Sequence, residues 1–578
     1  KSVATAPDWN ISRNRYWATA LPFWKCEHSE CGHVVCLGSI NELRSKSLNF
    51  DEVYPNAVAS STNQVSSNTP ELDTSYMLPD TIDLHRPYID RVKLKCEKCN
   101  GQMSRVPEVV DCWVESASMP FAELHYPFEH NAELRGATAI ADGRGKDPED
   151  FKNRFPADFV AEYIAQTRAW FYVMHVVSST IFQQAPFKHV VTTGNILAED
   201  GSKMSKSKNN YPDPNILIEK FGIDSIRFYL LTSSVMNGDD FNFSEKGVSE
   251  ISRKVNILLY NVWSFLRMYY KGVAPEARPA SEHVLDRWIL AKLFELHGKV
   301  TGCLDEYNTV KAGKDMVDFI NDLSTWYLRR SRDRLKLEGQ EGIQAGETLS
   351  YVLAELSKML APYMPFLADF IYKDVTGKES VHLASWSNLS MFSVETDVFS
   401  KMDIVREVAA LGLSVRKDKA LPVRQPLRAI AFSSKQKDSS LPDEFSRLIL
   451  EELNIKEIDA SLLDKDLRPD TGIIIVPGVG SVENFYLDTN LTPELKLEGT
   501  ARELERQVQD LRKKSGLKPG ELVDLYYNTQ DENLESCLLK LVNRKKTFVS
   551  QISKSYEVEA DFEIQAQAGG KPIWLGII

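Results

Sequence analysis

The 578-residue chain lacks an apolar run long enough to span a bilayer, and its N-terminus lacks the basic-then-apolar layout of a secretory signal. We therefore expect a cytoplasmic protein with no membrane partner. The chain also lacks an excess of positive charge, because its formal net charge is -12. This argues against nucleic-acid binding by bulk attraction but not against a local basic patch. With 43% hydrophobic and 26% charged residues, the composition is typical of a globular protein of roughly three to five domains, and we expect a monomer.

Cysteine is scarce: the eight residues are too few for a disulfide scaffold, and six of them lie in the first fifth of the chain. The pairs Cys26-x4-Cys31 and Cys96-x2-Cys99 can each bring two thiolates to one metal, and four sulfurs in a tetrahedral array suit structural Zn²⁺. Such a site would staple an insertion with little core of its own. Unconnected thiols are the plain alternative. The residues that could replace a ligand of the first pair are His28, His33 and Cys36.

The middle of the chain predicts a helix, a strand and a capped helix in succession. The apolar stretch Phe159–Ser178 suits a long buried helix, and the β-branched run 189–193 suits a short buried strand. Asp213 is a good N-cap, Pro214 a good first helical residue, and Gly222 a good helix end. A loop therefore hangs between the strand and the capped helix.

That loop, residues 200–210, carries three lysines among small hydroxyl-bearing neighbours: Lys203, Lys206 and Lys208. Lysines spaced in this way can gather on one side of a turn and meet phosphate oxygens as point charges on adjustable stems. A solvated surface loop is the alternative.

Beyond residue 250 the pattern is helical to about residue 375, which predicts a bundle. One apolar stripe consists of Leu285, Ile289, Leu293, Leu296, Val300 and Leu304. A basic run follows a second stripe, with Arg329, Arg330 and Arg332 at its start; solvated charge and a nucleic-acid contact are both consistent with it. After residue 400, short β-like runs and a charged helical stretch, Thr492–Lys514, indicate a separate α+β tail domain.

Several of these stretches resemble one known family. Lys203-Met204-Ser205-Lys206-Ser207 is identical to the KMSKS signature of class I aminoacyl-tRNA synthetases. The chain resembles the C-terminal part of the isoleucine-specific members, nearly end to end and most weakly after about residue 430. The stretches that carry this resemblance are Trp9–Trp17, Asp83–Tyr88, Asp111–Ala122, Phe155–Phe171 and Asp322–Arg332.

The resemblance implies an α/β Rossmann-like catalytic portion with a zinc-binding insertion, an α-helical anticodon-binding bundle and a small α+β C-terminal domain. The ranges that we predict are a catalytic re-entry segment at 1–25, the zinc-binding insertion at 26–105, the second half of the catalytic domain at 106–200, the lysine loop and stem-contact region at 201–250, the bundle at 251–400 and the C-terminal domain at 401–578.

The resemblance also implies a reaction and its residues. The family joins an amino acid, here L-isoleucine, to the α-phosphate of ATP, which binds with Mg²⁺, and then transfers the acyl group to tRNA(Ile). Lys203 and Lys206 are the implied catalytic residues. The implied adenylate-binding residues are Glu162, Gln166, Gly194, Met204 and Lys206, and the implied walls of the amino-acid pocket are Trp113 and Trp170. The implied structural Zn²⁺ ligands are Cys26, Cys31, Cys96 and Cys99, and the implied tRNA contacts are Arg329, Arg330 and Arg332.

The sequence departs from the family pattern at the adenylate motif, where Tyr163 and Ala165 stand for a usual Gly and a ribose-binding Asp. The sequence also holds no His-x-Gly-His motif and no editing domain before the Trp9 segment. We therefore expect that this polypeptide alone does not activate isoleucine. Two other hypotheses are a non-catalytic tRNA-binding module derived from such an enzyme, and a valine-type synthetase.

Overall fold

The computed structural model describes residues 8–55, 82–124, 126, 151, 153–389, 396–435, 441–463, 472–518, 521–539, 548–555 and 560–578. The polar stretch at 59–75, which the sequence predicts as a loop, lies outside these ranges. The chain divides into two compact units, one of residues 1–256 with 300–315 and one of residues 257–299 with 316–578. Among the described residues, every helix is too short or too polar to cross a membrane.

A small antiparallel sheet with its own core covers the predicted zinc-binding insertion and begins at Phe23, three residues before it. Its strands are in the order β3 (Val34–Cys36), β2 (Phe23–Cys26), β5 (Gln102–Arg105) and β4 (Leu94–Lys95), flanked by α1 (Ile40–Lys46), α2 (Phe50–Val53) and η3 (Ile89–Arg91). Trp24 is 2% exposed and donates its indole N–H to Val92 O at 2.9 Å. Leu43, Phe50 and Met103 pack in the same cluster. The insertion therefore has more core than the sequence predicts.

Further along the chain, strands β7 (Ala157–Tyr163) and β8 (Phe187–Thr193) form a parallel pair, and α7 (Trp170–Phe182) lies between them in the sequence. The prediction of one helix over 159–178 is wrong: its first part is β7, then η4 (Ile164–Arg168), and the helix begins at Trp170. A short apolar run does not distinguish strand from buried helix by itself, and pairing with β8 decides for the strand. The strand at 189–193 is confirmed, but the prediction that it is buried is wrong, because none of these five residues is buried.

Shorter elements complete the first unit. The antiparallel pair β1 (Ser12–Arg13) and β6 (Val109–Val110) precedes α4 (Cys112–Ala117) and α5 (Met119–Ala122). The parallel pair β9 (Ile196–Leu197) and β10 (Phe241–Asn242) brackets the lysine loop, α8 (Pro214–Phe221), α9 (Ile223–Leu231) and η5 (Ser234–Asn237). The Asp213 carboxylate accepts a hydrogen bond from Asn215 N, and Gly222 ends α8 at φ 77°, so the predicted cap and stop are confirmed.

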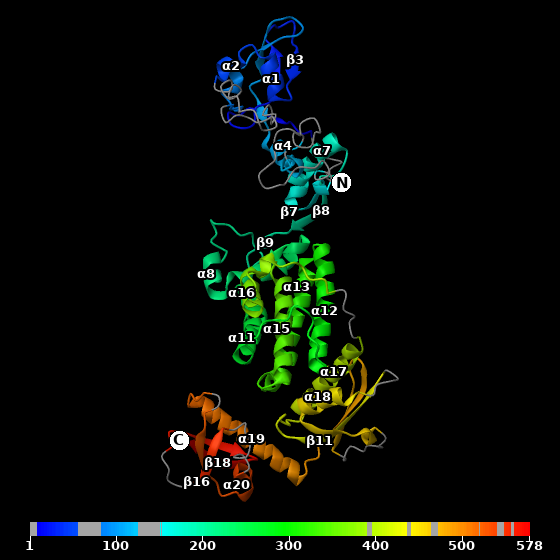
Figure 1. Cartoon of the computed structure of the whole chain (residues 1–578), viewed down its shortest axis with the longest axis vertical. Helices are drawn as coiled ribbons and strands as arrows, with labels where there is room; N and C mark the ends of the chain where they lie inside the picture. Colours follow the sequence, from blue (N-terminus) through cyan, green and yellow to red (C-terminus); the bar gives the residue numbers. More distant parts are fainter. Residues whose placement is uncertain are drawn as a thin grey trace, which may run out of the picture. The chain divides into compact units, whose positions relative to one another are not determined.

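Helices make up most of the predicted helical region, and the longest gap between them is residues 270–283. Its elements are α10 (Glu245–Ile251), the π-helix η6 (Ser252–Ile257), α11 (Leu258–Tyr269), α12 (Val284–Asp305), α13 (Thr309–Asp322), the π-helix η7 (Leu323–Leu328), α14 (Arg329–Leu335), α15 (Gln340–Leu360), α16 (Pro365–Thr376) and η8 (Val381–Leu383). Helix α15 packs against α11 and α16 (Figure 1), and it also packs against α14. Five of the six stripe residues on α12 are buried, as the periodicity predicts.

The tail holds two sheets where the sequence analysis predicts one α+β domain. The first, in the order β12-β11-β14-β13, consists of β12 (Ile455–Ile458), β11 (Leu427–Ser434), β14 (Val482–Asp488) and β13 (Ile473–Pro477), with α17 (Thr396–Asp418), α18 (Asp443–Leu453) and η9 (Ala460–Leu462). The second, in the order β16-β15-β18-β17, consists of β16 (Val549–Lys554), β15 (Val523–Asn528), β18 (Lys571–Ile577) and β17 (Phe562–Ala568), with α19 (Pro493–Lys514) and α20 (Glu532–Leu539). The charged helix predicted from Thr492 is α19, which Thr492 caps.

Candidate adenylate site and cysteine cluster

The lysine loop folds back on itself and leaves its lysines exposed. The backbone of Lys203 forms an isolated antiparallel β-bridge with Leu197 of β9. Lys206 lies in the turn that follows. Asn209 N donates to Lys206 O at 3.3 Å, and Lys208 N donates to Ser205 O at 3.2 Å. Among the described residues, neither Lys203 nor Lys206 forms an ion pair, so both ammonium groups are available to an anion.

Two side chains fix the course of this loop. Asn210 accepts from Ser205 N at 2.9 Å and donates to Ser202 Oγ at 2.9 Å and to Lys203 O at 3.1 Å. Met204 packs into the small core of α8 and β10, which includes Leu217. Met204, predicted to bind the adenylate, is therefore also an anchor of the loop. Asn210 was missed by the sequence analysis, because an Asn in a polar loop gives no signal that separates a brace from a solvated side chain.

The predicted adenylate-binding residues of the first motif stand where β7 ends. Glu162 pairs in register with Thr192 of β8, its carboxylate accepts from Tyr163 N at 2.9 Å, and its side chain is exposed. Gln166 lies in η4, and its Oε1 accepts from Trp170 N at 3.0 Å, where α7 begins. Because β7 and β8 are parallel, both carboxyl ends lie at one edge, where α/β sheets bind ligands.

The two replacements in this motif have different structural meanings. Tyr163 adopts φ -62° and ψ 143°, a conformation that any residue tolerates, so the backbone does not require the glycine of the family here. Ala165 has no polar side-chain group that could bind a ribose. The structure therefore explains how Tyr163 is accommodated and provides no substitute for the carboxylate at 165.

Gly194 follows β8 at the same edge. A Cβ added there would meet Asp239 O at 1.9 Å and Asp239 C at 2.4 Å. Gly194 N also donates to Val235 O at 2.8 Å. The close approach of the Asp239 backbone to residue 194 thus already requires glycine there. Binding of the adenylate at Gly194 stays a prediction.

The two tryptophans of the predicted amino-acid pocket come from neighbouring helices. Trp113 lies on α4 and is 37% exposed, whereas Trp170 opens α7 and is half-buried. Trp170 donates its indole N–H to Ser116 O at 3.0 Å, which ties α7 to α4. Trp170 also packs against the cluster of Ala117 and Phe171. The structure places both rings on the packed helix pair α4 and α7, and their role toward an amino acid stays a prediction.

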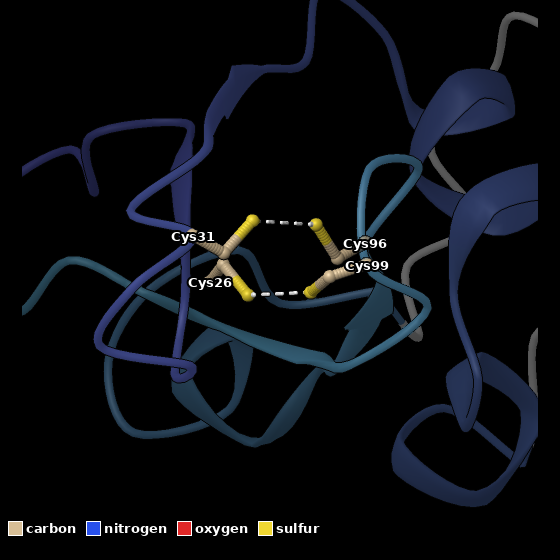
Figure 2. A group of neighbouring side chains, drawn as sticks. All are labelled: Cys26, Cys31, Cys96 and Cys99. Carbon is tan, nitrogen blue, oxygen red and sulfur yellow. Dashed lines mark hydrogen bonds between the residues drawn. The ribbon is translucent and has the colours of Figure 1, made fainter.

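The four predicted zinc ligands meet at one point (Figure 2). The Sγ atoms of Cys26 and Cys99 lie 3.4 Å apart, those of Cys31 and Cys96 lie 3.7 Å apart, and all four lie within 4.8 Å of one another. His28, His33 and Cys36 are not part of this group. The two knuckles are local turns: Cys31 N donates to His28 O at 3.0 Å, and Asn100 N donates to Cys96 O at 2.9 Å.

The surroundings of the four sulfurs suit a thiolate-binding metal ion. A Cβ at Gly101 would lie 3.2 Å from Cys99 Sγ and 3.8 Å from Cys26 Sγ, so glycine leaves room for the cluster. Although a backbone hydrogen bond from His28 lowers the pKa of Cys26, burial and the other sulfurs raise this pKa to about 12. Burial raises the pKa of Cys96, but hydrogen bonds from Cys99 and Lys98 N–H groups and the neighbouring thiols lower it to about 7. Crowded thiols of this kind are the donor set that Zn²⁺ prefers.

Comparisons with known proteins place the chain in a family. Residues 1–244 match the model of tRNA synthetases class I (I, L, M and V), and residues 286–431 match the model of the anticodon-binding domain of tRNA ligase. The chain belongs to the class I tRNA synthetase family.

The relatives to which the chain is similar include several isoleucine–tRNA ligases. It is 35% identical to one from Dehalococcoides mccartyi over 99% of this chain and 53% of the relative. It is 31% identical to one from Clostridium acetobutylicum, over 97% of this chain and 56% of the relative, and 32% identical to isoleucine–tRNA ligase 2 of Pseudomonas fluorescens, over 90% of this chain and 52% of the relative. The chain spans about half the length of these curated relatives.

In this synthetase the predicted tRNA-contacting arginines are not equivalent. Arg329 and Arg330 form ion pairs with Glu452 at 2.8 and 2.9 Å, and Arg330 also pairs with Glu451 at 2.5 Å. Arg332 is exposed, and its guanidinium carbon lies 5.6 Å from the Phe265 ring centroid. Among the described residues it forms no ion pair. Arg332 is thus the predicted contact whose charge is most available to phosphate.

A cavity of about 580 Å³ adjoins this basic run within the second unit. Trp326 lines it, with the guanidinium carbons of Arg329 and Arg406 lying 5.8 and 5.6 Å from its ring centroid. Carboxylates of Asp403, Glu407 and Glu452 complete the polar lining. Trp326 is half-buried and faces this cavity.

Proposed function

We propose that this chain is the part of an isoleucine–tRNA ligase that carries the lysine loop and the tRNA-binding bundle. The observation that carries the proposal is the exposed, braced loop with Lys203 and Lys206 after the parallel pair β7 and β8. The likeness to isoleucine–tRNA ligases over 99% of the chain supports the choice of isoleucine.

The reaction requires the protein to position the substrates and to neutralise the charge on phosphate. It requires no nucleophile from the protein. The carboxylate of the amino acid is itself the nucleophile toward the α-phosphate, so the protein's task is to hold both substrates in line and to stabilise the charge that develops on phosphate oxygens. Lys203 and Lys206 provide that positive charge. Glu162 and Gln166 orient the ribose and amino ends of the adenylate, and Trp113 with Trp170 encloses the isoleucine side chain. ATP enters as a substrate with Mg²⁺.

The polymer substrate in this proposal is tRNA(Ile). The match of residues 286–431 to an anticodon-binding domain supports this partner. Arg332, which forms no ion pair with any described residue, offers a cation to the RNA backbone, and the cavity beside Trp326 offers an aromatic face to an unstacked base.

We also propose that the cluster of Cys26, Cys31, Cys96 and Cys99 holds a structural Zn²⁺. The four sulfurs leave no position for a reacting ligand, which fits a closed site. The ion would tie the two knuckles together beside the core of Trp24. Its role is mechanical and lies apart from phosphate chemistry.

A chimera tests the ligase directly. This chain replaces the segment that it matches in the Dehalococcoides mccartyi enzyme, and isoleucine-dependent exchange of pyrophosphate into ATP is measured with valine as the competing amino acid. Exchange with isoleucine, followed by charging of tRNA(Ile), is the expected result. A folded chimera that exchanges with valine but not isoleucine would establish the valine-type alternative, and one inactive with both would contradict the proposal.

A second candidate is a non-catalytic tRNA-binding module. The observation that favours it is Ala165, which offers no ribose contact in the motif after β7. This candidate predicts that the 578-residue chain binds tRNA(Ile) while the chimera with an otherwise complete enzyme stays inactive. Restoring Asp by Ala165→Asp in the chimera separates the two, because only a site disabled at 165 gains exchange activity from it.

A further inference from the structure

Four exposed aromatic rings lie on two segments of the first unit, and the stacked pair Trp17 and His85 joins the two segments. Tyr16 and Trp17 follow β1 and are 61% and 68% exposed, and Tyr88, which precedes η3, is 44% exposed. Trp17 stacks on His85 with ring centroids 4.6 Å apart and the planes inclined by 6°. Large aromatic side chains usually lie in the core, so several exposed together indicate a binding surface. We call Tyr16, Trp17, His85 and Tyr88 the aromatic platform.

The platform is held in place by polar contacts beneath it. Arg86 donates to Arg15 O at 3.2 Å and to Asp90 Oδ2 at 2.8 Å, and its guanidinium carbon lies 5.5 Å from the Tyr16 ring centroid. His85 is fixed by Asp83, whose Oδ1 accepts from His85 N at 2.8 Å and lies 2.8 Å from Nδ1. The rings are therefore preorganised before any partner arrives, which lowers the entropy cost of binding.

The charge around the platform is positive. Arg86 and Arg105 share the single carboxylate of Asp90, at 2.8 and 2.7 Å. Arg15 and Arg91 are exposed, and among the described residues neither forms an ion pair; the guanidinium carbon of Arg91 lies 5.8 Å from the Tyr88 ring centroid. Surfaces that bind single-stranded nucleic acids combine arginines with exposed aromatic faces. The bases stack on the rings, and the phosphates contact the arginine cations.

We propose that the aromatic platform binds unpaired nucleotides of an RNA. One face of Trp17 is covered by His85, and a base stacks on its other face, while Arg15 and Arg91 contact the phosphates on either side. A double helix does not suit this surface, because its bases are already stacked and only its phosphates would reach the arginines. The inference stands beside the proposed function, since RNA binding here requires no amino-acid activation.

The test uses the 578-residue chain and fluorescein-labelled RNA of about eight nucleotides, a length within the site size of single-strand-binding modules. Fluorescence anisotropy gives the affinity of unstructured oligo(A) and oligo(U) and of a duplex of equal length. Trp17→Ala should weaken single-strand binding about fivefold or more, as the loss of one base–aromatic stack predicts, and Trp17→Phe should retain most of it. Arg91→Ala should reduce the salt dependence of binding.

Phe366→Ala is the matched control, because Phe366 is 67% exposed and belongs to the second unit. It should bind both oligonucleotides like the unaltered chain. Failure of the unaltered chain to bind, or equal affinity of the Trp17→Ala and Phe366→Ala variants, would overturn the proposal. Preference for the duplex would overturn it as well, in favour of plain charge attraction. Each variant's thermal unfolding curve shows whether it is folded, and Trp17→Phe gives the answer if Trp17→Ala is not.

Discussion

Arg334 binds Asp286 through both terminal nitrogens, at 3.0 and 2.9 Å, inside the helical region. The Asp286 side chain is fully buried and also accepts from Tyr327 Oη at 2.9 Å and from Ser281 Oγ at 2.7 Å. Burial and the neighbouring carboxylate raise the pKa of Tyr327 well above its usual value, so the phenol keeps the proton that it donates. Arg334, which belongs to the basic run that begins at Arg329, therefore lies in the protein interior.

The first prediction concerns this buried pair. Asp286→Ala should destabilise the helical region by roughly 3–5 kcal/mol, because it leaves the Arg334 charge buried with only the exposed Glu341 carboxylate, 3.4 Å away, as a partner. Lys299→Ala, which breaks the exposed pair with Glu295 on the same helix, should cost only about 0.3–0.5 kcal/mol. Thermal unfolding followed by helical circular dichroism measures both, and equal losses would contradict a structural role for the pair.

The second prediction concerns the lysine loop. In the chimera described above, Lys206→Ala should slow pyrophosphate exchange. The variant loses roughly 2–4 kcal/mol of transition-state stabilisation, the amount typical for the loss of one oriented donor. Lys208→Ala is the matched control on the same loop, two residues away, and should change exchange far less. Exchange that is unaffected by Lys206→Ala would refute the assignment of this residue.

The third prediction concerns the cysteine cluster. Freshly purified reduced protein should contain one zinc ion per chain by elemental analysis, and Cys96→Ser should lose it, since it removes one of the four converging sulfurs. Cys36→Ser, an exposed thiol of β3 outside the group, should keep the metal. Chelation should lower the unfolding temperature without unfolding the insertion, because the Trp24 cluster supplies a core. Protein free of zinc would contradict the site.

The fourth prediction concerns pH. Burial raises the pKa of Asp111, but hydrogen bonding from the Trp9 indole and the nearby Arg13 guanidinium, 2.7 Å away, lower it below its ordinary value. The folded chain therefore binds this proton less readily than the unfolded chain. The stabilisation is present in full above the unfolded pKa of about 4 and is lost as pH falls below it.

Asp111→Asn should accordingly lower the unfolding temperature at neutral pH, and the difference from the unaltered chain should shrink as pH falls below about 4. Asp158→Asn is the control: the carboxylate, paired with Lys188, is 80% exposed, so its removal should have a small effect at every pH. A difference between Asp111→Asn and the unaltered chain that does not depend on pH would contradict the linkage.

The fifth prediction separates two roles within the basic run. Arg332→Ala should weaken binding of tRNA(Ile) and reduce its salt slope by about 1, because its charge is free for a phosphate. Arg330→Ala should mainly lower stability, since it removes the ion pair with Glu451 and leaves Glu452, whose side chain is 8% exposed, with Arg329 as its remaining partner. Anisotropy across salt concentrations and thermal unfolding of the same samples distinguish these outcomes. The reverse pattern would show that the ion pairs with Glu451 and Glu452 open to admit RNA.

Much of the local structure was predictable because its signals lie within a few residues. The cap at Asp213, the helix end at Gly222 and the buried stripe of α12 each follow from neighbouring side chains. The secondary structure of residues 159–178 was not predictable from the sequence, because the apolar residues of this stretch suit either a strand or a helix. Parallel pairing with β8, from residues beyond the stretch, makes its first part β7.

The sequence by itself determined the family signature of the lysine loop, the pairing of cysteines within each knuckle and the periodicity of the bundle. Only the tertiary structure decided that cysteines 65 and 73 residues apart meet at one point, that Gly194 is required by the backbone of Asp239, and which charges of the basic run are free. Hydrogen-bonded turns and amphipathic faces are encoded locally, whereas the partner of a charge, a thiol or a glycine is chosen by which distant segments pack together.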